Sequence, residues 1–148
     1  MPSPICTLQL RVRYSETDQM GTFYYANALT WFEVARSELL RSCGIPYSEV
    51  ERRGFYMPVA ESYVKYLGRA HYDDLLTITV SGAMPSRARV RCDVKIIHAD
   101  GGAGVAEGFT IHAVIDARGK PVRPPDWLVA AFGGVGGTND VVGGKVIK

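Results

Sequence analysis

The sequence has few residues of the kinds that bind metals or form disulfides, and they are not clustered. It has three cysteines, at positions 6, 43 and 92, and three histidines, at positions 71, 98 and 112. Because the cysteines are odd in number and far apart, and no Cys-x-x-Cys or paired histidines occur, we expect no metal site. The sequence also has no dinucleotide-binding fingerprint, and we expect no cofactor. We expect the cysteines to be buried thiols in a reducing compartment.

The sequence also has no large excess of charge of one sign and no long apolar run. The chain has 17 Lys and Arg against 15 Asp and Glu, a formal net charge of +2, which is too small to indicate binding to nucleic acid. No apolar run approaches the roughly 20 residues of a membrane-spanning helix, and the N-terminus lacks the basic start and apolar core of a signal peptide. We therefore expect a cytoplasmic protein with no nucleic-acid partner and no membrane insertion.

The composition is that of one ordinary soluble domain. The chain has 148 residues, of which 47% are hydrophobic and 22% are charged. A chain of this length can bury a sizeable core without dividing into smaller units.

A polar and aromatic stretch at residues 14–27, YSETDQMGTFYYAN, separates an alternating strand expected at 8–14 from a long helix. Asp18 is its only plausible general base, and Gly21 permits a tight turn. A carboxylate beside the free N–H groups of a helix start suits attack on a carbonyl, since one group activates water and the other holds the developing oxyanion. Asp18 could equally do no more than stabilise the helix end.

The helix after this stretch is the clearest element in the sequence. We expect Asn27 to cap it, and Gly44 and Pro46 to end it. Its apolar positions recur at three- and four-residue steps, and they are Ala28, Phe32, Ala35, Leu39 and Cys43, with Leu29 and Trp31 broadening the stripe. This pattern predicts a largely buried helix.

Strands dominate the rest of the chain. We expect a short turn or helix at 47–54, strands at 57–67, 74–82, 89–98 and 104–116, a short helix at 126–132 and a flexible glycine-rich tail at 133–148. One early helix followed by antiparallel strands makes the fold class α+β. The strand at 57–67 is apolar on both faces, which predicts that both are covered. Glu61 and Lys65 on one of these faces could be an exposed pair or could line a pocket, and we favour the exposed pair.

An ordered set of residues resembles the opening of the hotdog-fold acyl-CoA thioesterases. The set is Tyr14, Thr17, Asp18, Gly21, Tyr24, Tyr25 and Asn27, followed by Trp31, Phe32, Glu33, Ala35 and Arg36. It is most similar to the 4-hydroxybenzoyl-CoA thioesterase family, including the Tol-Pal-associated acyl-CoA thioesterases, and residues 72–78 match that family where it enters its third strand. The resemblance covers about residues 8–130. It implies a hotdog domain at 1–132, in which a curved antiparallel sheet wraps one long central helix.

This resemblance implies a catalytic site for the hydrolysis of an acyl-CoA to a carboxylic acid and free CoA. Asp18 corresponds to the family's catalytic aspartate, either as nucleophile or as general base for water, and both routes stay open. The backbone N–H of Tyr25 at the helix start would polarise the thioester carbonyl. Ala28 stands where the family commonly has an aromatic residue, and the smaller side chain would widen the acyl pocket. Glu33, the only candidate for a carboxylate on the helix, is expected to bond locally with Arg36 or Ser37.

The resemblance also implies a set of substrate-binding residues. They are Gly21, Tyr24, Phe55 and Tyr63, together with Arg87, Arg89 and Arg123. The aromatic side chains would lie along the acyl group, and the arginines would lie near the CoA nucleotide. Each aromatic residue is an equally good core residue, and each arginine an equally ordinary surface charge.

Alternative functions stay open, and the resemblance also implies an oligomeric state. The acyl group could arrive on an acyl carrier protein, or the chain could bind acyl-CoA without hydrolysing it; a hotdog dehydratase is disfavoured because no histidine precedes His71. A hotdog sheet leaves an edge strand that needs a partner. We therefore expect an obligate homodimer, which could pair again into a tetramer. Asp18 of one chain would then work beside residues 59–66 of the other.

Overall fold

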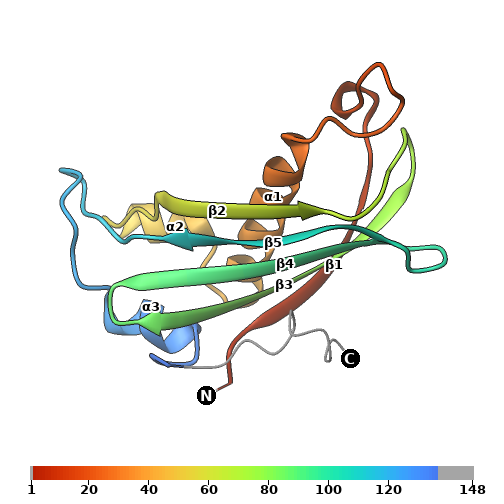
Figure 1. Ribbon diagram of the computed structural model, residues 1–148. Coiled ribbons are helices and arrows are strands. Elements are labelled where there is room, and N and C mark those ends of the chain that lie inside the picture. The colour runs from red at the N-terminus through yellow and green to blue at the C-terminus, as the bar shows by residue number, and fades with distance from the viewer. Residues whose placement is uncertain (1, 137–148) are drawn as a thin grey trace.

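In the computed structural model, which describes residues 2–136, a curved antiparallel sheet lies across one long helix (Figure 1). The elements are β1 (Ile5–Arg11), the short 3₁₀ helix η1 (Tyr14–Glu16), α1 (Asn27–Ser42), α2 (Tyr47–Arg52), β2 (Val59–Tyr66), β3 (Leu75–Ser86), β4 (Arg89–His98), β5 (Gly104–His112) and α3 (Asp126–Ala131). The predicted α+β class is confirmed. Apart from its first four residues, the predicted glycine-rich tail lies outside the described residues.

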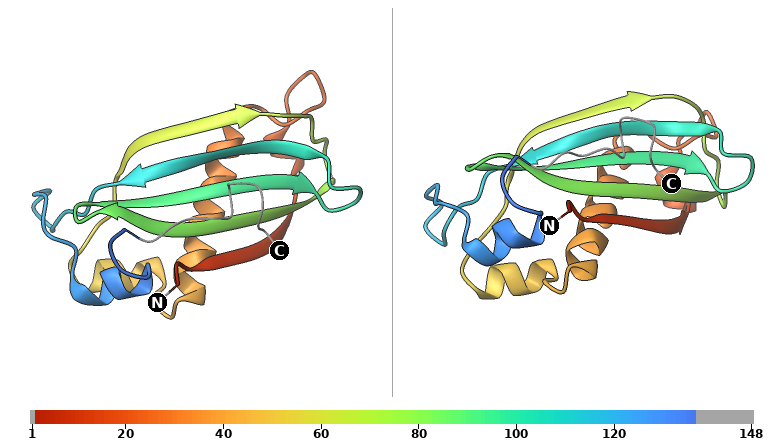
Figure 2. Two further views of the ribbon diagram at one scale, coloured as in Figure 1. Left: turned by 60° about the horizontal axis from the view of Figure 1, so that its bottom comes forward. Right: turned by 90° about the horizontal axis from the view of Figure 1, so that it is seen from below.

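Within residues 2–136, the sheet has five strands in the order β1-β3-β4-β5-β2, and all neighbours are antiparallel. The α-helices of the described residues, α1, α2 and α3, lie on one side of it, as the view from below shows (Figure 2). The strands β1 and β2 form the two edges of the sheet. The strand expected at 74–82 continues to Ser86, and its register with β4 shifts between Ala83 and Ser86.

Helix α1 packs its apolar stripe against the sheet. Ala28, Phe32, Ala35 and Leu39 are all fully buried, as predicted, and so is Trp31. Burying each of the large side chains stabilises the fold by about 1.5–3 kcal/mol. The helix ends where predicted, because the residue after Cys43 is a glycine with φ +81°.

Two predictions at the ends of this helix are wrong. Asn27 does not cap it: Ala26 holds the cap position, and the Asn27 side chain donates to the Glu16 carbonyl at 2.9 Å. Leu29 does not broaden the buried stripe, since it is 40% exposed.

The strand predicted at 8–14 begins earlier and ends earlier, at Ile5–Arg11. Leu8, Leu10 and Val12 point inward as predicted, but Tyr14 is 77% exposed because the chain turns away from the sheet in η1. Likewise β5 stops at His112, and the chain continues through an isolated bridge between Ile115 and Tyr56.

The edge strand β2 is the main exposed surface of the sheet. Within the described chain it pairs only with β5. Its large apolar side chains are half-exposed: Val59 by 49%, Tyr63 by 50% and Tyr66 by 46%. The prediction that both faces of this strand are covered is therefore wrong for a single chain. No helix in the described part of the chain is long and apolar enough to cross a membrane.

Candidate active site

The candidate site lies where β1 leaves the sheet and α1 begins. The Asp18 N–H donates to the Thr22 carbonyl at 2.9 Å, and the Gly21 N–H donates to the Asp18 carbonyl at 3.0 Å. Thr17 and Phe23 close this turn with an antiparallel bridge. Gly21 has φ +81°, a conformation that other residues rarely adopt. The predicted tight turn thus exists, and it fixes the backbone of Asp18.

The Asp18 carboxylate is partly engaged and partly open. One oxygen, Oδ1, accepts a hydrogen bond from the Met20 N–H at 2.8 Å. Within residues 2–136, the other oxygen has no hydrogen-bond or ion-pair partner. A half-buried carboxylate with one oxygen held and one open can accept a proton from water or attack a carbonyl carbon.

A second carboxylate on the same loop, Glu16, cannot do this work. It is only 4% exposed. Its oxygens accept from the Arg13 N–H at 2.7 Å, the Arg13 guanidinium at 3.1 Å and the Trp31 indole N–H at 3.0 Å. No sequence pattern marks Glu16, because its role depends on contacts that only the folded chain makes, and in the structure it is the anchor of the loop.

The start of α1 offers the N–H groups that the chemistry needs. The Tyr24 carbonyl accepts from the Asn27 N–H at 2.9 Å, and the Tyr25 carbonyl accepts from the Ala28 N–H at 3.2 Å. In the described part of the chain, the N–H groups of Tyr25 and Ala26 donate to no acceptor. They lie at the positive end of a 16-residue helix, where a developing negative charge is stabilised.

Exposed tyrosines surround this corner. The rings of Tyr24 and Tyr25 lie 4.8 Å apart, and the Tyr66 ring meets Tyr25 edge-on at 6.3 Å. The Tyr66 hydroxyl donates to the Tyr25 carbonyl at 3.0 Å, so the end of β2 contacts the helix start. A hydrogen bond with the Tyr25 side chain raises the pKa of Tyr24, and the negative charges of Tyr25 and Asp18 raise it further.

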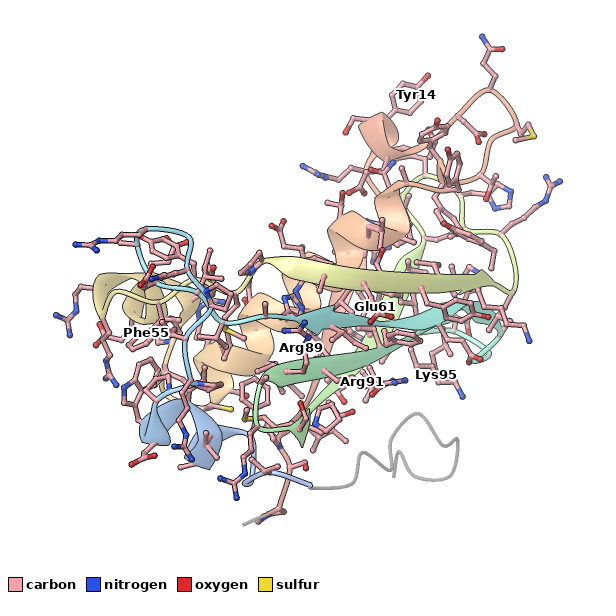
Figure 3. All side chains as sticks on the ribbon, turned by 60° about the vertical axis from the view of Figure 1, so that its left-hand side comes forward. Tyr14, Phe55, Glu61, Arg89, Arg91 and Lys95 are labelled. Carbon is pink, nitrogen blue, oxygen red and sulfur yellow. The ribbon has the colours of Figure 1, made fainter. Side chains whose placement is uncertain are left out.

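The other predicted substrate-binding residues lie elsewhere in the same chain. Phe55 packs edge-on against Trp127, with ring centroids 5.8 Å apart. Tyr63 stacks on Phe109 at 5.5 Å, on the sheet face opposite α1, where Figure 3 shows Glu61, Arg91 and Lys95. A single chain brings neither aromatic side chain beside Asp18.

The three arginines predicted near the CoA nucleotide are also remote from Asp18. Arg87 and Arg89 are exposed at the turn between β3 and β4, and Arg123 is exposed in the segment before α3. This turn lies at the left end of the sheet in Figure 1, whereas residues 14–26 lie at its upper right. In a single chain, the predicted site residues therefore lie at opposite ends of the sheet.

A cavity that the sequence did not reveal lies beside the first residue of β2. Its volume is about 260 Å³, and it is lined by Glu33, Arg36, Ser37, Leu40, Tyr47, Met57, Pro58, Val59, Cys92, His112 and Phe132. Burial lowers the pKa of Arg36, and the nearby carboxylate of Glu33 acts in the opposite direction. Within residues 2–136 Glu33 forms no hydrogen bond with Arg36 or Ser37, so that expectation is wrong.

The titratable groups that line this cavity are not catalytic candidates. The Nδ1 atom of His112 lies 3.0 Å from the Met57 carbonyl and must donate to it, so Nε2 accepts from the Thr110 hydroxyl at 2.9 Å. Burial lowers the pKa of His112 to about 4, so the imidazole is neutral near pH 7. Burial raises the pKa of the Cys92 thiol to about 12, so it is no nucleophile. In the described part of the chain, no three His, Cys, Asp or Glu side chains form a group that could hold a metal ion.

Comparison with known proteins identifies the family. The family model of the thioesterase-like superfamily matches residues 12–132. The chain belongs to this family. The match covers the loop of Asp18, all of α1 and the strands β2 to β5, and it confirms the predicted thioester hydrolase and hotdog fold.

Relatives and solved structures agree with this assignment to the thioesterase-like superfamily. YneP of Bacillus subtilis is 40% identical over 70 residues, which are 47% of this chain and 51% of that protein, so the match spans about half its length. The acyl-acyl carrier protein thioesterase ATL3 of Arabidopsis thaliana is 28% identical over 84% of this chain and 66% of its own. The crystal structure of a DHNA-CoA thioesterase from Staphylococcus aureus has a TM-score of 0.80 at 30% identity, covering 87% of this chain and 89% of that one.

Proposed function

We propose that this thioesterase-superfamily chain hydrolyses acyl-CoA thioesters, with Asp18 and the Tyr25 N–H as its catalytic groups. The observation that carries the proposal is the corner between the loop and α1. There, one open oxygen of Asp18 and an open N–H at the helix start are held on adjoining backbone turns. The naming of the Staphylococcus aureus structure as a CoA thioesterase supports CoA as the carrier.

The chemistry follows from these two groups. As a general base, Asp18 takes a proton from a water molecule whose oxygen attacks the thioester carbonyl carbon. As a nucleophile, it attacks that carbon itself and forms a mixed anhydride, which water then hydrolyses. In both routes the carbonyl oxygen becomes negative and accepts a hydrogen bond from the Tyr25 N–H, which typically lowers such a barrier by about 3 kcal/mol. The CoA thiolate leaves without needing a strong acid.

We further propose that the working unit is a homodimer joined through β2. A two-fold axis that pairs this edge with its own copy makes the two strands antiparallel. The Tyr66 end of one strand then lies beside the Val59 end of the other. The half-exposed apolar residues of β2 and its unpaired edge support this arrangement.

In such a dimer, the divided site becomes one. The corner with Asp18 adjoins Tyr66, while the cavity of about 260 Å³ adjoins Val59. Antiparallel pairing therefore brings the cavity of one chain toward the Asp18 corner of the other. It also brings the β3–β4 turn with Arg87 and Arg89 to the same end (Figure 1). We propose that the acyl group occupies this cavity and that these arginines lie near the CoA phosphates.

Two experiments test the proposed function. The purified chain, with its cysteines kept reduced, is assayed with short, medium, long and aromatic acyl-CoAs. The released CoA is measured. Hydrolysis of at least one class is expected, and tight binding without hydrolysis by the wild type would indicate a binding protein instead. Light scattering should give a dimer or tetramer mass, and a fully active monomer would contradict the shared site.

The alternative carrier is an acyl carrier protein, which the name of the Arabidopsis thaliana relative favours. The chemistry at Asp18 would be the same, because both carriers present a phosphopantetheine thioester. Matched acyl groups on CoA and on an acyl carrier protein should be compared by kcat/KM. A preference for CoA is expected, and a large preference for the protein carrier would replace CoA as the proposed substrate.

A further inference from the structure

The backbone that presents the candidate catalytic groups is tied together by one buried residue. The Glu16 carbonyl accepts the Tyr24 N–H at 2.8 Å and the Asn27 side chain at 2.9 Å. Tyr24 directly precedes the proposed oxyanion donor, and Asn27 is the first residue of α1. Two residues after Glu16 comes Asp18. Glu16 therefore holds the loop that carries the carboxylate against the turn that carries the N–H group.

The Glu16 side chain fixes this backbone to the core. Its carboxylate is 4% exposed and accepts the indole N–H of Trp31, a side chain that is fully buried. The Arg13 N–H donates to Oε1 at 2.7 Å, and the Arg13 guanidinium donates to Oε2 at 3.1 Å. Hydrogen bonds to a buried charged acceptor are among the strongest in proteins, and removing the acceptor leaves buried donors unpaired.

The direction of the Tyr25 N–H depends on this anchor. The N–H shares a rigid peptide plane with the Tyr24 carbonyl, which points at the Asn27 N–H at 2.9 Å. Because the C=O and N–H bonds of a trans peptide point in opposite directions, the Tyr25 N–H points away from the helix. A displacement of about 1 Å in such a group can cost roughly 100-fold in rate.

We propose that Glu16 is a positioning residue, which sets the geometry between the Asp18 carboxylate and the Tyr25 N–H without touching the substrate. This inference rests on the proposed function of that corner. It separates the two carboxylates of the loop into an open, reactive one and a closed, structural one.

The test compares Glu16→Ala, Glu16→Gln and Trp31→Phe with the wild type by kcat, KM and unfolding midpoint. Asp93→Asn is the matched control, because Asp93 is also a buried carboxylate bound by an arginine, Arg91, but lies on β4 away from the loop. We expect Glu16→Ala to lower kcat by about 10- to 100-fold while KM changes less than about threefold. The control should change the unfolding midpoint and leave kcat within about twofold of the wild type.

The double variant provides a signature that general destabilisation does not produce. In Glu16→Gln, the amide NH₂ faces either the Arg13 N–H or the Trp31 indole N–H, because both donors point at the former carboxylate. Adding Trp31→Phe removes one of these donors and the repulsion with it. The combined loss in kcat should therefore be smaller than the product of the two single losses. Strictly multiplicative losses would overturn the proposed geometry.

A spectroscopic readout keeps the test independent of activity. The chain has two tryptophans, so the indole N–H resonance of Trp127 is an internal reference for that of Trp31. Glu16→Ala should shift the Trp31 indole resonance and speed hydrogen exchange at the Tyr24 amide, with Trp127 unchanged. If these signals respond but kcat does not, Glu16 is structural only and the proposal fails while the proposed function stands. If Asp18→Asn keeps full activity, the proposed function fails instead, whatever Glu16 does.

Discussion

Protonation of the buried His112 should make the protein progressively less stable in mild acid. The imidazole is 3% exposed, and both ring nitrogens are used by Thr110 and Met57. Burial lowers its pKa from 6.5 to about 4. The native state therefore stays unprotonated at this site while the unfolded chain takes up a proton below pH 6.5. The free energy of unfolding must fall as the pH drops from 6.5 toward 4.

The size of this effect follows from the pKa difference. One pKa unit corresponds to about 1.4 kcal/mol, so the shift of His112 to about 4 corresponds to a loss of roughly 3 kcal/mol by pH 4. Urea unfolding at fixed protein concentration, between pH 7 and pH 4.5, measures it. His112→Asn should flatten this dependence, and His71→Gln controls for the loss of an exposed histidine. An unchanged slope in His112→Asn would refute the reasoning.

Three further predictions concern residues whose environment is unusual. A Cβ at Gly108 would lie 1.9 Å from the Tyr63 carbonyl oxygen, so Gly108→Ala should force β2 away from β5. The free energy of unfolding, measured with urea, should fall by at least ~2 kcal/mol. A free energy of unfolding within about 0.5 kcal/mol of the wild-type value would contradict this. A Cβ at Gly21 has space, so Gly21→Ala costs mainly the backbone strain of φ +81°, about 1–2 kcal/mol. Because Asn adopts this conformation more readily than Ala, Gly21→Ala should lower kcat more than Gly21→Asn does. Equal kcat values for the two variants would be the contrary result. Because burial raises the pKa of Cys92 to about 12, a thiol reagent should titrate fewer than three thiols in the native protein and three in denaturant, and three fast thiols in the native protein would be inconsistent with its burial.

Local patterns predicted most of the fold. The apolar stripe of α1 and the strict alternation along β4 depend only on the period of the backbone, so the buried positions and approximate bounds follow from sequence alone. The predicted ends of the helices and strands were less accurate, because tertiary contacts decide where each element ends. Tyr14 continues the alternation of β1, but the chain leaves the sheet before it.

The site could be predicted only where its residues are close in sequence. Asp18, Gly21 and Tyr25 lie within one loop and one helix start, and the hydrogen bond from the Tyr24 N–H to the Glu16 carbonyl joins the two sides of that loop. The role of Glu16 depends on Trp31, 15 positions later, and that of the Tyr66 hydroxyl on a carbonyl 41 positions earlier. Such contacts depend on packing and leave no periodic signal. Asparagine is a common helix-capping residue, but the side chain of Asn27 donates to the Glu16 carbonyl instead.

The assignment of the chemistry to Asp18 is tested most directly by one substitution. Asp18→Asn keeps the size of the side chain and an oxygen that can accept the Met20 N–H, but removes the charge that acts as base or nucleophile. The measurement is kcat on the acyl-CoA that the wild type hydrolyses best, with Asp100→Asn in the exposed β4–β5 turn as the control. We predict a fall of at least ~100-fold for Asp18→Asn and none for the control. A kcat within about twofold of the wild type would contradict the account.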